Sequence, residues 1–167
     1  TTFMDEFHTL AYETLDDALA EGGFDGVAVC SPTRFHVEQC VPALEAGLPV
    51  LLEKPVSKTL AEAEKLAGAM KRTGTSLLLG YTWRWWPPLL RVRELLAQNP
   101  VGEIRYLDFT MSAHLEDWPP GEPLADFFMS SAELGGGALL DESHWVDLML
   151  WFFGMPESLS ARVEKIS

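Results

Sequence analysis

Basic residues are scarce in this chain of 167 residues, which has 12 lysines and arginines against 25 aspartates and glutamates and a formal net charge of −13. Proteins that bind nucleic acids depend on clustered lysine and arginine side chains, which release counterions from the phosphate backbone. The nearest approaches to such a cluster are Lys71-Arg72 and Arg91-Val92-Arg93. The charge balance therefore argues against a nucleic-acid partner.

Long hydrophobic runs are also missing. The longest apolar stretches, such as Leu148 to Phe153, fall far short of the roughly 20 residues that a membrane-spanning helix needs, and no charged leader precedes them. We therefore expect no role in a bilayer and a cytoplasmic location. Hydrophobic residues still make up 47% of the chain, which suffices for one good core or two small ones.

Cysteine is rare as well, with only Cys30 and Cys40 in the chain. They fall on an expected strand and on the helix that follows it, and their spacing does not match that of a metal site. The simplest interpretation is that both are reduced, buried thiols of a cytoplasmic protein.

Three short apolar runs in the first half of the chain, at 26–30, 49–52 and 76–81, are typical of buried parallel strands. Helical patterns separate them, and the connections are short. Strands that alternate with helices in this way demand a parallel sheet with right-handed crossovers. We therefore predict an α/β fold for this half.

The expected helices of the first half carry recognisable start and stop signals. A short helix is predicted at 16–20, and an amphipathic one over 34–46, in which Pro42 predicts a kink or a later start. The next helix opens with a capping box at 59–62, runs through Lys71 and stops at Gly74.

The second half changes character. A helix is expected over 87–98, and alternating apolar residues at 104–111 predict a longer strand of the kind found in antiparallel sheets. A loop at 116–123, rich in proline and acid, leads to a helix over 141–153 and to the start of another strand at 159–166.

Ligands of parallel α/β sheets bind at the carboxyl ends of the strands. Those ends are predicted at 31–33, 53–55 and 80–84. Lys54 follows a strand directly and precedes a proline that fixes its backbone, although the sequence leaves the proline isomer open. Its ammonium could donate a hydrogen bond to a developing alkoxide. The alternative is a surface pair with Glu53 or another carboxylate, and the position at a strand end favours the functional interpretation.

Ionisable residues recur at helical spacing in the second half. Asp141 and His144 are three residues apart, so on one helix they share a face, and Asp147 continues the row. Histidine changes charge near neutral pH and suits proton transfer. The alternative, which the spacing alone slightly favours, is a satisfied core histidine behind a carboxylate that the helix dipole stabilises. A metal site built from these residues is a weaker hypothesis.

Two further features are less specific. The Gly135-Gly136-Gly137 run permits backbone torsions closed to other residues or the close approach of a ligand, but a plain loop would also explain it. Trp83, Trp85 and Trp86 surround Arg84 and could stack on a sugar face. For at least two of these tryptophans we favour a place in the core or an interface.

Taken together, these residues resemble the Gfo/Idh/MocA oxidoreductases, nicotinamide-dependent enzymes that act mostly on sugars and cyclitols. The resemblance runs through almost the whole chain, and the order and spacing of its short motifs are specific. The motifs are Phe24-Asp25-Gly26-Val27, Ser31-Pro32-Thr33-Arg34-Phe35-His36, Ala43-Leu44-Glu45-Ala46-Gly47, Glu53-Lys54-Pro55, Gly80-Tyr81 with Arg84, Val101-Gly102-Glu103-Ile104 and the triple-glycine helix.

The resemblance implies a partial Rossmann-like dinucleotide-binding domain over 1–82, followed over 83–167 by part of an α+β substrate and oligomerisation domain with a mostly antiparallel sheet. It implies NAD or NADP as cofactor, a small sugar-like substrate and a homo-oligomer. Lys54 would contact nicotinamide and substrate, His144 would act as acid or base, and Asp141 would support them, so that all three are catalytic and substrate-binding. The implied cofactor-binding residues are Ser31, Pro32, Thr33, His36, Glu53, Lys54, Pro55 and Arg84.

The sequence departs from the family in two ways. Many members space the aspartate and the histidine by four residues, whereas Asp141 and His144 are three apart. Members also begin with a strand and a G-x-G-x-x-G turn that holds the pyrophosphate, and no such motif occurs here. We therefore expect these residues to be part of a longer polypeptide. Taken alone, they should bind cofactor poorly. A non-catalytic sugar-binding or partner-binding relative is the main alternative, and a metal-assisted hydrolase is a remote one.

Overall fold

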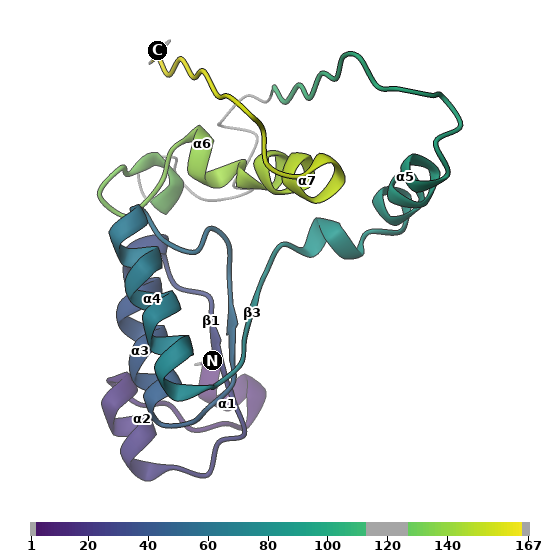
Figure 1. The fold of residues 1–167 in the computed structure, drawn as a ribbon. Coiled ribbons are helices and arrows are strands. Elements are labelled where there is room, and N and C mark those ends of the chain that lie inside the picture. Colours follow the sequence, from purple (N-terminus) through teal and green to yellow (C-terminus); the bar gives the residue numbers. More distant parts are fainter. Residues whose placement is uncertain (1–2, 113–126, 165–167) are drawn as a thin grey trace.

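A three-stranded parallel sheet organises the first half of the chain in the computed structural model, which describes residues 3–112 and 127–164 (Figure 1). Its strands are β1 (Val27–Val29), β2 (Val50–Leu52) and β3 (Leu77–Leu79), in the order β1-β2-β3. Both pairings are parallel. The predicted α/β fold of this half is therefore confirmed.

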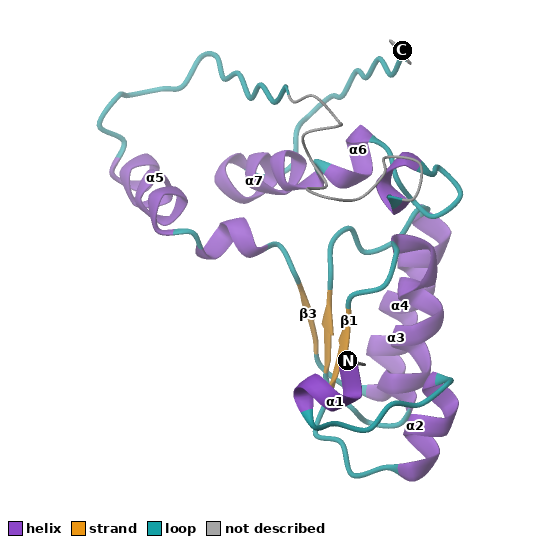
Figure 2. Cartoon of the chain, turned by 180° about the vertical axis from the view of Figure 1, so that it is seen from behind, coloured by secondary structure: helices purple, strands orange, loops and turns teal. Residues whose placement is uncertain are grey.

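Helices α3 (His36–Glu45) and α4 (Leu60–Thr73) pack against one face of the sheet and against each other, as Figures 1 and 2 show from opposite sides. Residues along each strand point alternately to the two faces. The inward-facing residues and the helices form a core of Val29, Val37, Cys40, Ala43, Leu44, Val50, Leu52, Leu66 and Ala69.

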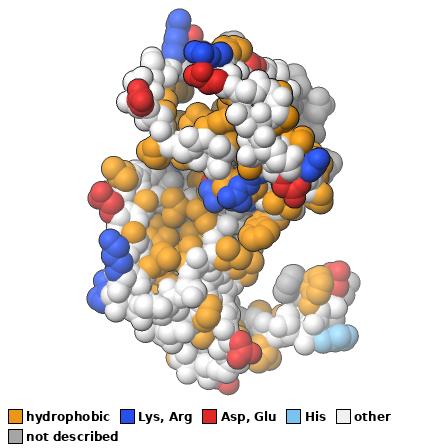
Figure 3. Space-filling model, turned by 45° about the vertical axis from the view of Figure 1, so that its right-hand side comes forward, with side chains coloured by type: hydrophobic (Ala, Val, Ile, Leu, Met, Phe, Trp, Pro, Cys, Tyr) orange, Lys and Arg blue, Asp and Glu red, His pale blue; other side chains and the backbone are white. Residues whose placement is uncertain are grey.

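The opposite face of the sheet is open in the described residues. Ala28, Leu51 and Leu78 alternate with the core positions and are exposed, the two leucines to 47% and 58%. Figure 3 shows hydrophobic side chains gathered at the surface of the lower, sheet-containing part of the molecule. Parallel sheets are ordinarily covered on both faces. In this sheet, however, the described elements cover one face only.

The helix boundaries follow the signals in the sequence. Helix α1 spans Phe3–Phe7, and α2 (Leu15–Glu21) matches the short helix predicted at 16–20. Helix α3 begins at His36, later than the start of the range predicted at 34–46, and continues through Pro42. The proline leaves the carbonyl of Glu38 without its helical partner, and because Glu38 is exposed, water can replace that hydrogen bond.

The capping box of α4 forms as predicted. The Thr59 hydroxyl accepts a hydrogen bond from the Glu62 backbone N–H at 3.3 Å, and the Glu62 carboxylate accepts one from the Thr59 backbone N–H at 3.1 Å. Gly74 ends the helix in the left-handed conformation, with φ of 70°, and donates its N–H to the Met70 carbonyl at 2.9 Å.

The regular elements in the described part of the second half are all helices or helical turns. Helix α5 (Pro87–Gln98) starts at the predicted proline pair and ends at Asn99, which adopts the left-handed conformation. It is preceded by the 3-10 turn η2 (Thr82–Trp85), and a second 3-10 turn, η5, spans Phe128–Ser130. The chain then forms α6 (Ala138–Asp141) and α7 (Ser143–Phe153). No helix in the described ranges has both the length and the apolar character needed to cross a membrane.

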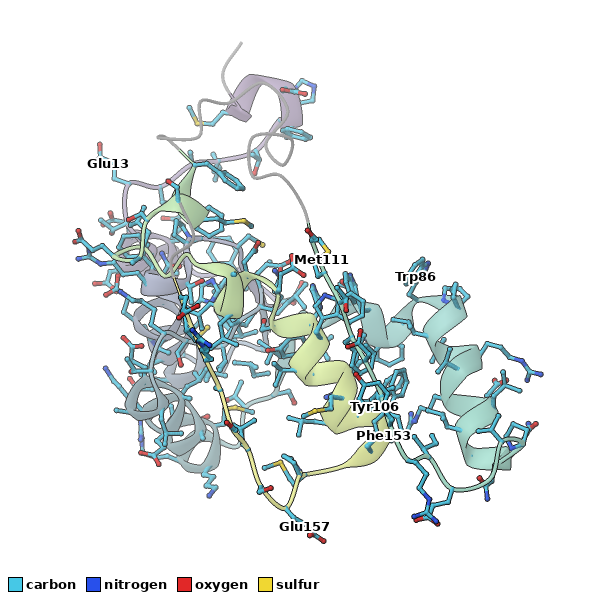
Figure 4. The ribbon with its side chains drawn as sticks, turned by 90° about the horizontal axis from the view of Figure 1, so that it is seen from above. Glu13, Trp86, Tyr106, Met111, Phe153 and Glu157 are labelled. Atoms are coloured by element: carbon cyan, nitrogen blue, oxygen red, sulfur yellow. The ribbon has the colours of Figure 1, made fainter. Side chains whose placement is uncertain are left out.

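The strand predicted at 104–111 was wrong, as was the described part, 159–164, of the strand predicted at 159–166. A strand requires a neighbour that exchanges backbone hydrogen bonds with it, and neither segment has one among the described residues. The first segment instead passes over α7 (Figure 4), with the Phe109 ring centroid 5.4 Å from that of Trp145. The second, antiparallel sheet is thus absent from the described part, and the loop predicted at 116–123 lies outside it.

The two cysteines differ. Cys40 is completely buried, and this burial raises the pKa of its thiol to about 11. Cys30 follows the last residue of β1 and is exposed, so the expectation that both thiols are buried was wrong. Neither cysteine forms a disulfide.

Two glycines of α4 should respond oppositely to replacement by alanine. Gly68 is exposed within the helix with open space where a Cβ would lie, so Gly68→Ala should raise the free energy of unfolding by about 0.5–1 kcal/mol. Gly74 has φ of 70°, so Gly74→Ala should lower it by about 1–2 kcal/mol. Urea denaturation of both variants measures these changes, and shifts of the same sign would contradict the account of how α4 ends.

Candidate functional site

A cavity lies at the carboxyl ends of the strands, where the α6–α7 segment lies over the sheet (Figure 1). Its volume is about 200 Å³. The lining comes from the loops after β1 and β2 and from the segment leading into α6. The lining residues are Cys30, Ser31, Thr33, Glu53, Lys54, Pro55, Phe128, Met129, Gly135, Gly136 and Asp141.

Glycines allow the segment before α6 to close one side of this cavity. Gly135 has φ of 93°, and a Cβ there would lie 2.6 Å from the Cβ of Thr33. At Gly136 a Cβ would clash with the backbone carbonyl of Met129. The Leu134 carbonyl accepts a hydrogen bond from the Arg34 backbone N–H at 3.1 Å. The glycine run thus brings backbone from the second half of the chain against the loop that follows β1. Its positive φ at Gly135 is one of the backbone torsions that the sequence led us to expect only glycine to permit.

Lys54 spans the cavity to reach α6. Its Nζ donates to the backbone carbonyl of Asp141 at 2.6 Å and lies 3.3 Å from the Asp141 Oδ1. The two side chains are 17% and 14% exposed. Lys54 therefore pairs with a mostly buried carboxylate on a distant segment, and the alternative of a surface pair with Glu53 does not describe it. The Lys54-Pro55 peptide bond, left open by the sequence, is cis.

Aromatic rings enclose His144, which is 8% exposed on the first turn of α7. The Trp83 ring stacks on the imidazole with centroids 4.6 Å apart and planes within 3°. Tyr81 meets it edge-on at 5.7 Å. Burial lowers the pKa of His144, the nearby Lys54 ammonium lowers it further, and carboxylates led by Asp147 partly offset both effects. The site therefore favours the neutral imidazole.

Asp147 is held by Arg84. The guanidinium Nε donates to Oδ2 at 2.8 Å and Nη2 to Oδ1 at 2.5 Å, a bidentate pair that joins η2 to α7. Asp147 is 8% exposed, whereas the Arg84 side chain is 40% exposed. The hydrogen bond to Asp147 raises the pKa of Arg84, so the guanidinium keeps its charge.

The predicted row of Asp141, His144 and Asp147 on a single helix does not form. Glu142, with φ of −88° and ψ of 21°, separates α6 from α7, so Asp141 ends one helix while His144 and Asp147 share the next. Each of the three residues has a different partner on a segment that follows β2 or β3. Asp141 pairs with Lys54, His144 stacks on the Trp83 ring, and Asp147 pairs with Arg84.

The predicted cofactor-binding residues divide into two groups. Ser31, Thr33, Glu53, Lys54 and Pro55 line the cavity, while Pro32, His36 and Arg84 are not in its lining.

His36 is 1% exposed, and both of its ring nitrogens lie 2.8 Å from backbone carbonyls, those of Pro55 and Ser31. Its polar atoms are thus engaged within the protein. The geometry makes it a brace between the loops after β1 and β2.

Sequence reasoning missed the role of one tryptophan. Trp83 is the ring that covers His144, which nothing in its spacing along the sequence indicated. Trp85 and Trp86 are 71% and 55% exposed, so they are not core residues, and a place in an interface stays a prediction for them. In Figure 4 Trp86 projects outward near the start of α5.

The arrangement brings an ammonium and a largely neutral imidazole to one edge of the sheet. An ammonium can donate a hydrogen bond to an oxygen that gains negative charge, and a neutral imidazole can accept a proton. Within residues 3–112 and 127–164, no group of three or more His, Cys, Asp or Glu side chains is placed to hold a metal ion.

Comparison with known proteins places both halves in one family. Residues 1–81 match the Gfo/Idh/MocA oxidoreductase family with an NAD-binding Rossmann fold, and residues 89–167 match the Gfo/Idh/MocA C-terminal domain. Among curated relatives, the chain is 33% identical to D-glucoside 3-dehydrogenase of Escherichia coli over 79% of its length and 36% of that protein. It is 29% identical to inositol 2-dehydrogenase of Leifsonia xyli over 87% of its length and 40% of that protein.

Solved structures share the fold. The WlbA dehydrogenase of Bordetella pertussis, in complex with NADH and UDP-GlcNAcA, superposes with a TM-score of 0.76 over 90% of this chain and 43% of that one, at 23% identity. The chain thus spans about two fifths of the length of the relatives it matches.

The pair between Arg84 and Asp147 should stabilise the site measurably. Arg84→Ala leaves a buried carboxylate without its partner and should lower the free energy of unfolding by about 1–3 kcal/mol, less than for a fully buried pair because Arg84 is partly exposed.

Adding Asp147→Asn to Arg84→Ala should recover part of this loss, because the unpaired charge is then gone. Arg91→Ala, which breaks an exposed pair with Glu94, is the matched control and should cost less than about 0.5 kcal/mol. Equal losses for Arg84→Ala and Arg91→Ala in chemical denaturation would contradict the assignment.

Proposed function

The chain belongs to the Gfo/Idh/MocA family of oxidoreductases, and from this premise we propose that the protein transfers a hydride between NAD or NADP and a secondary alcohol carbon of a sugar, sugar derivative or cyclitol. The relatives that are sugar and inositol dehydrogenases support this substrate class. The observation that carries the proposal is the placement of Lys54 and Asp141 in the wall of the strand-end cavity, with His144 close enough to interact electrostatically with both.

The residues at the cavity fit the nicotinamide end of such a cofactor. Ser31, Thr33, Glu53 and Lys54 place polar groups in its wall beside Pro55, at the carboxyl ends of parallel strands, the usual place for a dinucleotide. Pro32 belongs to the same loop. No G-x-G-x-x-G turn for the pyrophosphate occurs in the sequence, so these residues account for one end of the cofactor only. When bound, the cofactor supplies the hydride acceptor or donor.

Lys54 and His144 divide the work on the substrate oxygen. In the direction of oxidation, the Lys54 ammonium donates a hydrogen bond to the oxygen as its negative charge grows, and the neutral His144 takes the hydroxyl proton. Reduction reverses the proton transfer. Asp141 positions the ammonium, since both its carboxylate and its backbone carbonyl lie within reach of Nζ. Lys54, Asp141 and His144 are accordingly the proposed catalytic and substrate-binding residues.

The proposed organisation has a dinucleotide-binding part over 1–82 and a substrate part over 83–167. The two family matches, over 1–81 and 89–167, support a division near residue 82. The proposed ligand besides the cofactor is a small sugar-like molecule, and assembly into a homo-oligomer stays a prediction from the resemblance.

A non-catalytic relative that binds a sugar or a partner protein is the alternative. Such a protein would bind a sugar without any nicotinamide and transfer no hydride. Calorimetric titration of a sugar with and without NAD or NADP separates the two functions.

Loss of the Lys54 ammonium should disable the reaction without unfolding the protein. In the complete protein, Lys54→Ala should lower kcat for oxidation of a sugar or cyclitol by about 10²- to 10³-fold, because the oxygen loses its charged donor. Lys65→Ala, which removes an exposed lysine of α4, is the matched control and should leave kcat unchanged. With circular dichroism showing both variants folded, near-normal turnover of Lys54→Ala would sink the proposed role.

The acidic side of the pH profile should report His144. Oxidation needs the neutral imidazole, and the pKa of His144 is lowered from 6.5, so the base form persists to a lower pH than for an ordinary histidine. In the complete protein, kcat/KM for oxidation should therefore fall only below pH 6.5. His144→Asn should lower kcat/KM and remove this titration. An inflection above pH 6.5, or one that survives in His144→Asn, would assign the base elsewhere.

A further inference from the structure

Trp83 has no part in the chemistry above, yet it makes the closest side-chain contact recorded for the imidazole of His144. The two rings are stacked nearly parallel, with centroids 4.6 Å apart and an angle of 3° between their planes. Tyr81, two residues earlier, meets the same imidazole edge-on at 5.7 Å. The segment that follows β3 therefore supplies two aromatic walls of the histidine site.

The indole of Trp83 is itself held in place. Trp145, the neighbour of His144 on α7, meets it edge-on with centroids 5.0 Å apart and planes at 87°. The backbone N–H of Trp86 donates to the Trp83 carbonyl at 3.2 Å, which closes the turn of η2. The bidentate pair from Arg84 to Asp147 then fastens this turn to α7. The stack therefore joins two anchored elements.

Within the described part of the chain, no hydrogen bond to Nδ1 orients the imidazole of His144. Reactive imidazoles ordinarily hydrogen-bond one nitrogen to a carbonyl or carboxylate, which fixes both the tautomer and the ring plane. The Nδ1 of His144 is buried and has no hydrogen-bond partner among the described residues. The aromatic contacts remain as the interactions that define the plane of its ring.

We propose that Trp83 is a positioning residue for His144: its indole sets the plane of the imidazole and keeps water from one face of it. This inference rests on the proposed function, in which His144 exchanges the substrate proton. The indole of Trp83 carries no group that exchanges a proton near neutral pH, so its proposed effect on the reaction passes through the stacked histidine.

The charged groups around His144 determine how its titration should respond. Lys54 and Glu53 act from the loop after β2, Asp141 from the end of α6 and Asp147 from one turn further along α7. Burial makes the largest contribution and lowers the pKa of His144. Replacing Trp83 by a residue that cannot cover the ring would admit water while leaving all four charged groups in place. The pKa of His144 should then move upward.

The experiment is an NMR titration of the His144 ring in the complete protein, with the resonance assigned by its loss in His144→Asn. Trp83→Leu should raise the pKa of His144, whereas Trp83→Phe, which retains an aromatic face, should leave it close to that of the unchanged protein. Trp85→Leu is the matched control, because Trp85 is 71% exposed and makes no recorded ring contact with His144. A pKa in Trp83→Leu that is unchanged or lower, or an equal rise in Trp85→Leu, would overturn the proposal.

A second measurement uses the unchanged protein. Because the imidazole of His144 is stacked on the indole of Trp83, the ring current of the indole should shift the resonances of the carbon-bound imidazole protons upfield. Resonances at ordinary histidine positions would overturn the stacking on which the proposal depends.

Activity separates this proposal from the function on which it rests. In the complete protein, Trp83→Leu should move the acidic limb of the kcat/KM profile to higher pH, in step with the titration. A rise in the pKa of His144 in a protein that transfers no hydride would reject the proposed function and retain the positioning role. If hydride transfer depends on Lys54 but the pKa of His144 does not change in Trp83→Leu, the proposed function is retained and the positioning role of Trp83 is rejected.

Discussion

The contact between Lys54 and Asp141 is the interaction on which the site depends, because it joins residues 87 positions apart in the chain across a mostly buried gap. Its geometry needs three local features at once. A strand must end at Leu52, the glycine run must let the following segment approach the loop after β1, and α6 must end at Asp141. A charged pair that is removed from water stabilises the fold only when its geometry is good. The loop after β2 and the end of α6 must therefore be held in fixed positions relative to each other.

Two other contacts hold these positions. Arg84 fastens η2 to Asp147 on α7, and the Trp83 ring lies on His144 one turn earlier. The three partners in the second half thus meet three partners that follow β2 or β3. The net charge of the chain is −13. At this edge of the sheet, Lys54 and Arg84 are each paired with a carboxylate, and the neutral imidazole of His144 lies beside them.

Much of the first half could be predicted because its signals are local. Apolar runs, the capping box at Thr59 and the stop at Gly74 each depend on a few neighbouring residues, and the parallel order follows from chain connectivity. The segment at 104–111 was mispredicted because alternation describes how a strand could bury one face, whereas a strand forms only with a hydrogen-bonded neighbour. The partners of Asp141, His144 and Asp147 could not be predicted, since the break at Glu142 redirects each side chain.

In the proposed reaction a hydride passes directly between an alcohol carbon and a nicotinamide ring. Its fate can be followed by incubating the complete protein with NAD or NADP and with sugars or cyclitols that carry deuterium on the alcohol carbons, and then locating the label by NMR. Direct transfer should place deuterium on the reduced cofactor, in equal amount to the carbonyl product. A sugar that binds while its deuterium stays on carbon would rule out hydride transfer and indicate a binding protein.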